Sequence, residues 1–309
     1  MSIWNDMSWV PALRTPFLNQ MFELITLMGY PLFSVMFLCF GYFALGSKRF
    51  FHTAMLLMAA GLVNSWLKDI GQDPRPAAEF ALDSGVGKSY GWPSGHMQIA
   101  VVLWGYLAYS VRDTAYKNLA YWAAGIFIVL QGFSRLYLGV HDLGDVASGF
   151  VIGCLCLYAY ISAQNHPRIS SGIAQLPMAQ AVGCLLALHL IYTIFYPSHV
   201  DHHAPIWFAG AMMGWLLGRY WMRGGDVNLP GPRIVQLLIA SGLTGLSFVW
   251  MALTTRIPRA LELGETGMAM PINYGFGILF GVGVIYVLPK LVSKITGSAS
   301  ASASASASA

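Results

Sequence analysis

Nine apolar runs, separated by short polar segments, account for most of the chain. The runs cover residues 24–46, 51–69, 95–111, 119–139, 143–163, 178–196, 204–222, 233–254 and 272–292. An α-helix rises about 1.5 Å per residue, so about 20 apolar residues cross the hydrocarbon core of a bilayer, which is roughly 30 Å thick. The pattern therefore predicts an all-α fold, a polytopic transmembrane helical bundle with about nine spans.

The two ends of the chain carry different patterns. Residues 1–22 mix Trp4, Trp9 and Phe17 with polar side chains, which is typical of a helix lying in the membrane interface. Residues 297–309 repeat serine and alanine, which cannot bury a core, and we interpret them as a Ser/Ala linker outside the fold. Residues 166–296 are expected to add transmembrane helices of unknown role.

Composition agrees with a membrane location and excludes some partners. Of 309 residues, 56% are hydrophobic and 10% are charged, whereas a soluble domain carries about a quarter charged residues. The net charge of +4 is spread over the loops, and without a basic tract we expect no nucleic-acid partner. The four cysteines lie inside apolar runs, which favours buried packing over disulfides or a metal site.

Two polar segments at the ends of apolar runs offer groups suited to an anion. Lys68 and Arg75 lie seven positions apart and supply an ammonium and a guanidinium. Ser94, Gly95 and His96 open the next apolar run with a hydroxyl, a flexible residue and an imidazole. Unpaired N–H groups and the positive end of the dipole attract an anion to a helix N-terminus.

A third polar segment, residues 133–145, carries the densest chemistry. If the following helix starts near His141, then His141 and Asp145 lie four residues apart on one face. The carboxylate can accept the proton of one ring nitrogen, which fixes the tautomer and frees the other nitrogen to attack. Arg135, just upstream, is a planar fork suited to a phosphate. The alternative is a membrane-edge loop with a few polar residues.

The order of these motifs resembles the three-part signature of the type 2 phosphatidic acid phosphatase superfamily. The motifs are Lys-x6-Arg-Pro at 68–76, Pro-Ser-Gly-His at 93–96 and Ser-Arg-x5-His-x3-Asp at 134–145. The superfamily includes lipid phosphate, polyprenyl diphosphate and sphingosine phosphate phosphatases, glucose-6-phosphatase and vanadium haloperoxidases. The resemblance covers roughly residues 24–163 and implies a catalytic core of the six-helix type within residues 23–165.

The resemblance also implies a role for each motif residue. His141 would attack the phosphorus and form a covalent phosphohistidine, Asp145 would orient it, and His96 would protonate the leaving oxygen and then activate water. The remaining motif residues would hold the phosphate oxygens: Lys68, Arg75, Ser94, the backbone N–H of Gly95, and Arg135. The resemblance implies no metal and no cofactor. A further carboxylate beside a phosphate would repel it, so Asp73 and Asp142 are not expected to take part.

Several functions remain open from the residues. The leading hypothesis is a membrane phosphatase acting on a lipid phosphate or diphosphate: polyprenyl diphosphate, phosphatidate, phosphatidylglycerol phosphate or a sphingoid phosphate. The alternatives are a glucose-6-phosphatase-like hydrolase of a soluble ester and a phosphotransferase. An anion transporter is less favoured because transport does not need the His141–Asp145 pair. The expected partners are a phosphorylated lipid and membrane lipids, and homo-oligomerisation is left open.

The distribution of basic residues predicts an orientation. In a nine-span arrangement one side of the membrane collects ten Lys and Arg residues and the other collects seven, three of which belong to the proposed site. By the positive-inside rule the first side is cytoplasmic. All three motifs fall on the opposite side, which predicts an active site facing the periplasm, in a bacterial inner membrane, or a lumen.

Three further features allow two interpretations each. The loop 77–92 is either a lid over the substrate or a solvated connection. The group His199, Asp201, His202 and His203 is either a metal site or, as its spacing favours, a polar interfacial loop. The glycine ridges in the last spans, at 210, 214 and 218 and at 275, 277, 281 and 283, favour close helix packing, with a dimer contact as the alternative for the first ridge.

Overall fold

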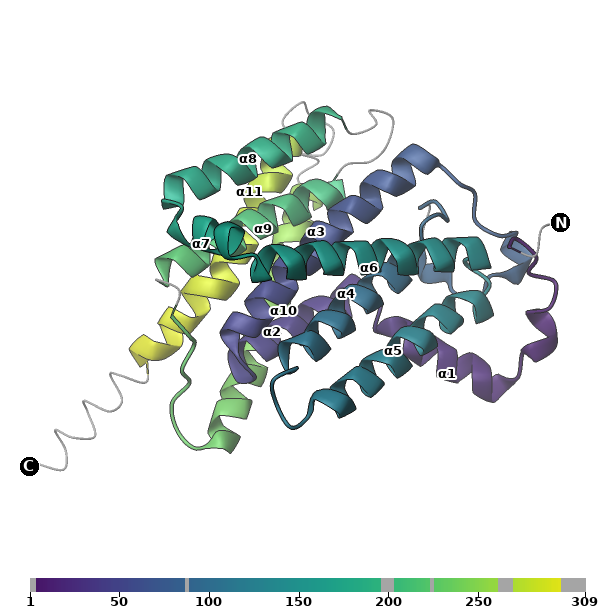
Figure 1. Cartoon of the computed structure of the whole chain (residues 1–309), viewed down its shortest axis with the longest axis horizontal. Coiled ribbons are helices and arrows are strands. Elements are labelled where there is room, and N and C mark those ends of the chain that lie inside the picture. The colour runs from purple at the N-terminus through teal and green to yellow at the C-terminus, as the bar shows by residue number, and fades with distance from the viewer. Residues whose placement is uncertain (1–3, 87–88, 196–202, 223–224, 261–268, 296–309) are drawn as a thin grey trace, which may run out of the picture. The chain divides into compact units, whose positions relative to one another are not determined.

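The computed structural model describes residues 4–86, 89–195, 203–222, 225–260 and 269–295, and this part of the chain forms helices and no strands (Figure 1). The predicted all-α class is therefore confirmed. The main helices are α1 (Pro16–Leu27), α2 (Pro31–Ala44), α3 (Ser47–Gly71), α4 (Gly95–Ser110), α5 (Lys117–Tyr137), α6 (Leu143–Asn165), α7 (Pro167–Gln175), α8 (Met178–Ile194), α9 (His203–Trp221), α10 (Arg233–Ala260) and α11 (Ala269–Val282).

The chain divides into two compact units that interleave along the sequence. The first contains Met1–Ser34, Leu56–Leu176 and Ala187–Val200, and the second contains Val35–Met55, Pro177–Leu186 and Asp201–Ala309. These units differ from the predicted division at residues 165 and 166, because most of α2 and the first part of α3 belong to the second unit. All eight residues of the proposed site lie in the first unit.

The apolar run 24–46 forms two helices instead of one. Helices α1 and α2 meet at a bend of 56°. Pro31 cannot donate a backbone hydrogen bond, and it disfavours a helical conformation at Tyr30, so a new helix begins at the proline. Helix α1 starts earlier than expected, at Pro16 inside the predicted interfacial segment, where the side chain of Thr15 accepts a hydrogen bond from Leu18 N.

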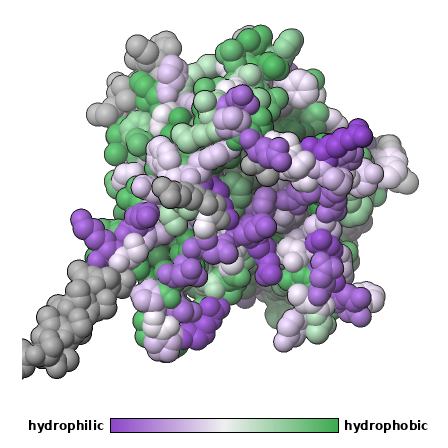
Figure 2. Space-filling view, turned by 60° about the vertical axis from the view of Figure 1, so that its left-hand side comes forward, coloured by the Kyte–Doolittle hydropathy of each residue, from purple (hydrophilic) through white to green (hydrophobic). Residues whose placement is uncertain are grey.

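Each of the other eight predicted runs coincides with a helix, but not every helix is long enough to count as a span by itself. Five of the described helices are long and apolar enough to cross a membrane, and the bent pair α1–α2 raises this to six. The count of nine spans therefore remains a prediction. Many large apolar side chains are exposed, among them Trp122, Leu155 and Leu190. Figure 2 shows a face on which hydrophobic and hydrophilic areas are mixed, with hydrophilic side chains across its middle.

In the first unit, α4 packs against both α5 and α6 (Figure 1). Glycines in α6 allow the close approach, because a Cβ atom at Gly149 would lie 2.5 Å from the carbonyl oxygen of Ser94. Met97 of α4, Leu136 of α5 and Val146 of α6 form a buried apolar cluster beneath these helix ends. The packing therefore holds the start of α4, the end of α5 and the start of α6 next to one another.

In the second unit, α9 and α11 pack through glycines of both helices. A Cβ atom at Gly214 would lie 2.2 Å from the carbonyl oxygen of Ile278, and one at Gly281 would lie 2.5 Å from that of Ala211. The packing role predicted for these ridges is confirmed except at Gly275, where a Cβ atom would meet nothing within 4 Å. Because α11 covers the ridge of α9, the ridge serves a contact within the chain and not the alternative dimer contact.

Replacing Gly277 with alanine is expected to destabilise the second unit. Its Cβ atom would lie 2.2 Å from the carbonyl oxygen of Trp207, so the helix backbones must move apart at a cost of about 1–3 kcal/mol. Thermal unfolding in detergent measures this as a lowered Tm. Gly275→Ala is the matched control, because no atom lies within 4 Å of a Cβ at that position. Equal Tm values for the two variants would contradict the packing role.

Candidate active site

The three polar segments meet at neighbouring helix ends of the first unit. Lys68 lies in the last turn of α3, Ser94 is the residue before the first turn of α4, and Arg135 lies in the last turn of α5. Asp145 lies in the first turn of α6, and its carbonyl oxygen accepts a hydrogen bond from Ser94 N at 3.0 Å. Segments that are far apart in sequence are therefore joined directly at the backbone.

His141 and Asp145 form the pair that their spacing predicted. The distance from His141 Nδ1 to Asp145 Oδ2 is 2.9 Å, and each side chain is 2% exposed. Helix α6 starts at Leu143, as the apolar run 143–163 predicted, so His141 lies in the turn before the helix. Asp142 caps α6 by accepting a hydrogen bond from Asp145 N at 2.9 Å, and Asn5 Nδ2 donates to its other oxygen at 2.9 Å.

Arg75 lies beside the other nitrogen of the imidazole. Its Nη1 is 3.2 Å from His141 Nε2 and donates to the carbonyl oxygen of Val140 at 2.8 Å. Ser89 fixes the rest of the guanidinium, because Nε donates to its carbonyl oxygen at 2.7 Å and Nη2 to its hydroxyl at 2.8 Å. With the Nδ1 proton donated to Asp145, Nε2 carries the lone pair and points to a cation.

The surroundings of His141 favour its neutral form. Burial lowers the pKa of His141 well below its ordinary value, and the positive charges of Lys68, Arg135 and Arg75 lower it further. A neutral imidazole keeps a free lone pair at pH 7, which a nucleophile requires. The three cations act on the same ring because the fold brings them to one site.

The loop 77–92 orients two of these cations and is more than a solvated connection. Lys68 Nζ donates to the carbonyl oxygens of Tyr90 and Gly91, the second at 2.8 Å. Gly91 also approaches Asp145 so closely that a Cβ atom there would lie 2.9 Å from Oδ2. Together with the contacts of Ser89 to Arg75, these bonds build one wall of the site from the loop. Whether the loop also acts as a lid remains a prediction.

Arg135 is fully buried and is held at one nitrogen only. Nη1 donates to the hydroxyl of Thr26 and, at 2.8 Å, to Asp83 Oδ2. Its Nε and Nη2 have no hydrogen-bond partner among the described residues. These two nitrogens form the edge of the guanidinium that binds a phosphate through two parallel bonds. A buried donor without a partner costs stability, so the unpaired edge is a strong indication of a ligand.

Two other motif residues also have a buried polar atom without a hydrogen-bond partner among the described residues, Ser94 Oγ and His96 Nε2. The His96 ring hydrogen-bonds the backbone of Thr26, and the ring of Tyr30 stands edge-on to it, with 4.7 Å between centroids and 88° between planes. The Nε2 atom is therefore left for a ligand. The backbone N–H of Gly95 lies in the first turn of α4, as predicted.

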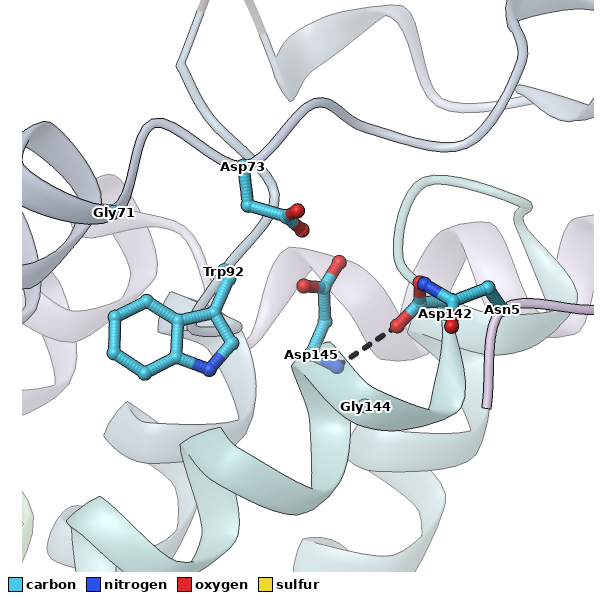
Figure 3. A pocket seen from close by; sticks show the side chains of 7 residues that line it. All are labelled: Asn5, Gly71, Asp73, Trp92, Asp142, Gly144 and Asp145. Carbon is cyan, nitrogen blue, oxygen red and sulfur yellow. Dashed lines mark hydrogen bonds between the residues drawn. The ribbon is translucent and has the colours of Figure 1, made fainter. Parts of the chain in front are cut away.

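A pocket of about 360 Å³ adjoins the His141–Asp145 pair. Figure 3 shows the carboxylates of Asp73 and Asp145 facing each other across it, with Trp92 to one side and Asp142 near the rim. Three carboxylates thus line the pocket, together with Trp92, Asn5, Gly71 and Gly144. A phosphate would be repelled here, so the pocket is not expected to hold the reacting group.

Metal ligation finds no support in the described ranges, in which no group of three or more His, Cys, Asp or Glu side chains is arranged to hold an ion. Of the histidine-rich segment considered above, His199, Asp201 and His202 lie outside the described residues. His203 is the first residue of α9.

Four residues of the site were not found from the sequence. Thr26 and Tyr30 belong to an apolar run, and Asp83 and Ser89 belong to a glycine-rich loop that carries no motif. Their contacts are made across the fold and leave no spacing signal. A weak signal exists for Asp83, an acidic residue in the loop that follows the first motif.

Membrane-spanning helices and a buried cationic site beside a His–Asp pair define an integral membrane protein with a site for an anionic group. Comparisons with known proteins narrow this class. The profile of the PAP2 superfamily matches residues 49–168, which include all three motifs. Phosphatidylglycerophosphatase B of Bacillus subtilis (strain 168) is 31% identical over 160 residues, which cover 47% of this chain and 75% of that protein.

Two further similarities are to a yeast enzyme and to a solved structure. Dolichyldiphosphatase of Saccharomyces cerevisiae is 34% identical over 112 residues, 32% of this chain and 46% of that protein, so the match spans less than half of the yeast enzyme. The crystal structure of a transmembrane PAP2 type phosphatidylglycerolphosphate phosphatase from Bacillus subtilis is 27% identical, with a TM-score of 0.43, covering 50% of this chain and 81% of that one. The chain belongs to the PAP2 superfamily, as its motifs indicated, and it is a phosphate ester hydrolase.

Proposed function

We propose that this protein is a metal-independent membrane phosphatase that hydrolyses a lipid phosphate or diphosphate through a phosphohistidine intermediate. The observation that carries the proposal is the environment of His141. One ring nitrogen is 2.9 Å from a buried carboxylate, and the other is 3.2 Å from a guanidinium that can bind the phosphate. The names of the relatives, a phosphatidylglycerophosphatase and a dolichyldiphosphatase, support a lipid substrate and leave monoester and diphosphate open.

The first step forms a bond between His141 Nε2 and phosphorus and breaks the bond between phosphorus and the leaving oxygen. Arg75 turns its N–H groups from Nε2 to a phosphate oxygen when the substrate binds, which releases the lone pair for attack. Asp145 accepts the hydrogen bond from the Nδ1 proton, which stays on the ring, and it stabilises the positive charge that develops there. The carboxylate is buried with the ring, so its effect is not screened by water.

The second histidine handles the protons. The bound phosphate places negative charge beside His96, which favours uptake of a proton from solvent at Nε2. The imidazolium donates this proton to the leaving oxygen, and the neutral ring then accepts a proton from the water that attacks the phosphohistidine. Its Nε2 is buried without a partner in the described structure, as a group reserved for the substrate would be. Hydrolysis returns His141 to its starting form and releases inorganic phosphate.

The equatorial phosphate oxygens are bound by cations and helix-end donors. Lys68, Arg75 and Arg135 supply the charge, and Ser94 Oγ with the N–H of Gly95 supplies neutral donors. Three side-chain cations offset the charge of a phosphate without a metal ion. We further propose that the site faces the periplasm or a lumen, because the motif side carries fewer basic residues.

A substrate panel tests the proposed function. Purified wild type is incubated with detergent-dispersed phosphatidylglycerol phosphate, phosphatidate, sphingoid phosphate and polyprenyl diphosphate, and with glucose 6-phosphate, and released phosphate is measured. We expect release from at least one lipid and little from the sugar phosphate. Release from the sugar phosphate alone would favour the soluble-substrate alternative. Transfer of the phosphoryl group to an added alcohol without release would favour the phosphotransferase.

Chelation and vanadate test the proposed chemistry with the same assay. EDTA is expected to leave the rate within about twofold, because side chains supply the positive charge that the transition state needs. Vanadate is expected to inhibit competitively, because it adopts the five-coordinate geometry of the transferring group and can bind Nε2 of His141. Complete loss of activity on chelation, restored by a divalent ion, would contradict the metal-independent mechanism.

A further inference from the structure

A chain of side-chain contacts connects His96 to Arg135 through two residues outside the three motifs. The ring of Tyr30 stands edge-on to the ring of His96, with 4.7 Å between their centroids. The hydroxyl of Tyr30 lies 2.7 Å from both carboxylate oxygens of Asp83. Asp83 Oδ2 in turn accepts from Arg135 Nη1 at 2.8 Å. Tyr30 and Asp83 thus connect the proposed acid–base residue, His96, to a proposed phosphate-binding residue, Arg135.

Tyr30 reaches this place because of the break between α1 and α2. It is the last residue before Pro31, and its N–H donates to the carbonyl oxygen of Leu27 at 3.2 Å in the closing turn of the first helix. Gly29 lies directly on the histidine, since a Cβ atom there would be 2.2 Å from His96 Cδ2. The corner of the broken helix therefore packs onto the imidazole. Its residues precede the region matched by the superfamily profile, which starts at residue 49.

Asp83 is placed by the attachment of its loop to the end of α5. Leu82 N donates to the carbonyl oxygen of Leu138 at 2.8 Å. Gly139 adopts a φ of 68°, and a Cβ atom there would lie 1.9 Å from the carbonyl oxygen of Phe80. Only glycine allows this approach of the two backbones. The loop is thereby fixed a few residues from Arg135.

The carboxylate of Asp83 is held by donors on several sides. Besides Tyr30 and Arg135, Gly85 N donates to Oδ1 at 2.9 Å. Burial raises the pKa of Asp83, but the hydrogen bonds from Tyr30 and Arg135 outweigh this effect and bring the pKa below its ordinary value. A Cβ atom at residue 85 would lie 2.5 Å from the Tyr30 hydroxyl, so the glycine leaves the space that the bond needs.

These contacts hold Arg135 by one nitrogen and leave its other edge open. Nη1 is occupied by Thr26 and Asp83, while Nε and Nη2 have no partner among the described residues. A guanidinium fixed in this way presents its two-nitrogen edge in one orientation, and little rotational freedom is lost when a phosphate binds.

We propose that Tyr30 and Asp83 are positioning residues for the phosphatase reaction, which hold Arg135 toward the phosphate and His96 toward the leaving oxygen. The inference rests on the proposed function, because both groups act only if the site binds a phosphate ester. Neither residue touches the reacting atoms. Asp83 orients Arg135, and Tyr30 contacts both this carboxylate and the ring of His96. The pair therefore couples phosphate binding by the arginine to proton transfer by the histidine.

Because Asp83 is charged, an electrostatic role and a positioning role predict opposite changes in KM when it is replaced with asparagine. A carboxylate near the phosphate repels it, so a purely electrostatic role predicts that Asp83→Asn binds phosphate more tightly and lowers KM. A positioning role predicts the opposite, because Arg135 loses its fixed orientation. Tyr30→Phe changes no charge and keeps the ring against His96, so any loss in this variant reports the hydroxyl contact alone.

The experiment measures kcat and KM for wild type, Tyr30→Phe, Asp83→Asn and the double variant on the best lipid of the substrate panel. Each single variant is expected to lower kcat/KM about tenfold to a hundredfold, the range for a displaced reacting group. The double variant is expected to resemble Asp83→Asn, since the two residues share one interaction. Tyr121→Phe and Asp113→Asn, both at exposed positions, are the matched controls and should remain at wild-type rates.

One more variant, Tyr30→Leu, separates the two ends of the contact chain. Tyr30→Leu removes the ring beside His96 and is expected to lose more activity on the lipid than on p-nitrophenyl phosphate, whose leaving group needs no proton. Unchanged kcat/KM in Tyr30→Phe and Asp83→Asn, or a lowered KM in Asp83→Asn, would overturn the inference. The proposed function would still stand if the wild type is active and His141→Ala is inactive. A wild type that releases no phosphate from any ester would overturn both.

Discussion

Replacing His141 with alanine is expected to lower phosphate release by about 10⁴-fold or more, the scale on which loss of a covalent nucleophile acts. The variant removes the only atom placed to attack, because in the described site Nε2 of His141 faces Arg75 while Nδ1 is taken by Asp145. The remaining cations can still bind the phosphate. We therefore expect kcat to collapse with a much smaller change in substrate binding.

The intermediate provides an independent measurement of the same prediction. A bond between phosphorus and an imidazole nitrogen survives in base and is cleaved in acid, which distinguishes it from a phosphoserine. Rapid quenching of wild type with ³²P-labelled lipid into alkali should leave label on the protein, and His141→Ala should carry none. His166→Ala is the matched control, because this residue caps the end of α6, far along the helix from the site. Normal turnover by His141→Ala would rule out the assigned nucleophile.

The sequence predicts the parts of this structure that are encoded locally. Apart from the first run, the apolar runs anticipate where the helices begin, because the length and composition of a run decide whether it can be a membrane helix. The pairing of His141 with Asp145 follows from their separation of four residues. The break at Tyr30 was also accessible in principle, since Pro31 stands inside the run 24–46, but a long apolar run outweighed one proline in the prediction.

The contacts of the loop could not be predicted in the same way. Nothing local distinguishes Asp83, which holds Arg135, from Glu79, which lies in the short helix Ala78–Phe80 and carries no motif either. The distinction arises only when the loop attaches to the end of α5 at Leu138. The sequence motifs therefore contain the residues that react or bind phosphate. The residues that orient them come from other segments, which only the packing of the fold brings close.

Asp145→Asn is expected to lower kcat by about 10³- to 10⁴-fold, by analogy with the effect of the same change in a Ser-His-Asp triad. The amide has the shape of the carboxylate, so the start of α6 is retained. Its NH₂ group can donate to His141 Nδ1, which moves the ring proton to Nε2 and removes the lone pair that attacks phosphorus. The amide also fails to stabilise the positive charge that forms on the ring.

A neighbouring carboxylate supplies the control for this prediction. Asp142→Asn makes the same chemical change three residues away, and asparagine caps a helix about as well as aspartate, so α6 and the activity should both be kept. Steady-state kinetics on the best lipid substrate measure kcat for both variants, and thermal unfolding shows that both are folded. Because the orienting role acts on the attacking group, the loss in Asp145→Asn should fall on kcat and leave KM within a few-fold. A folded Asp145→Asn within tenfold of the wild-type kcat, or an equal loss in Asp142→Asn, would mean that the carboxylate beside His141 serves the fold and not the reaction.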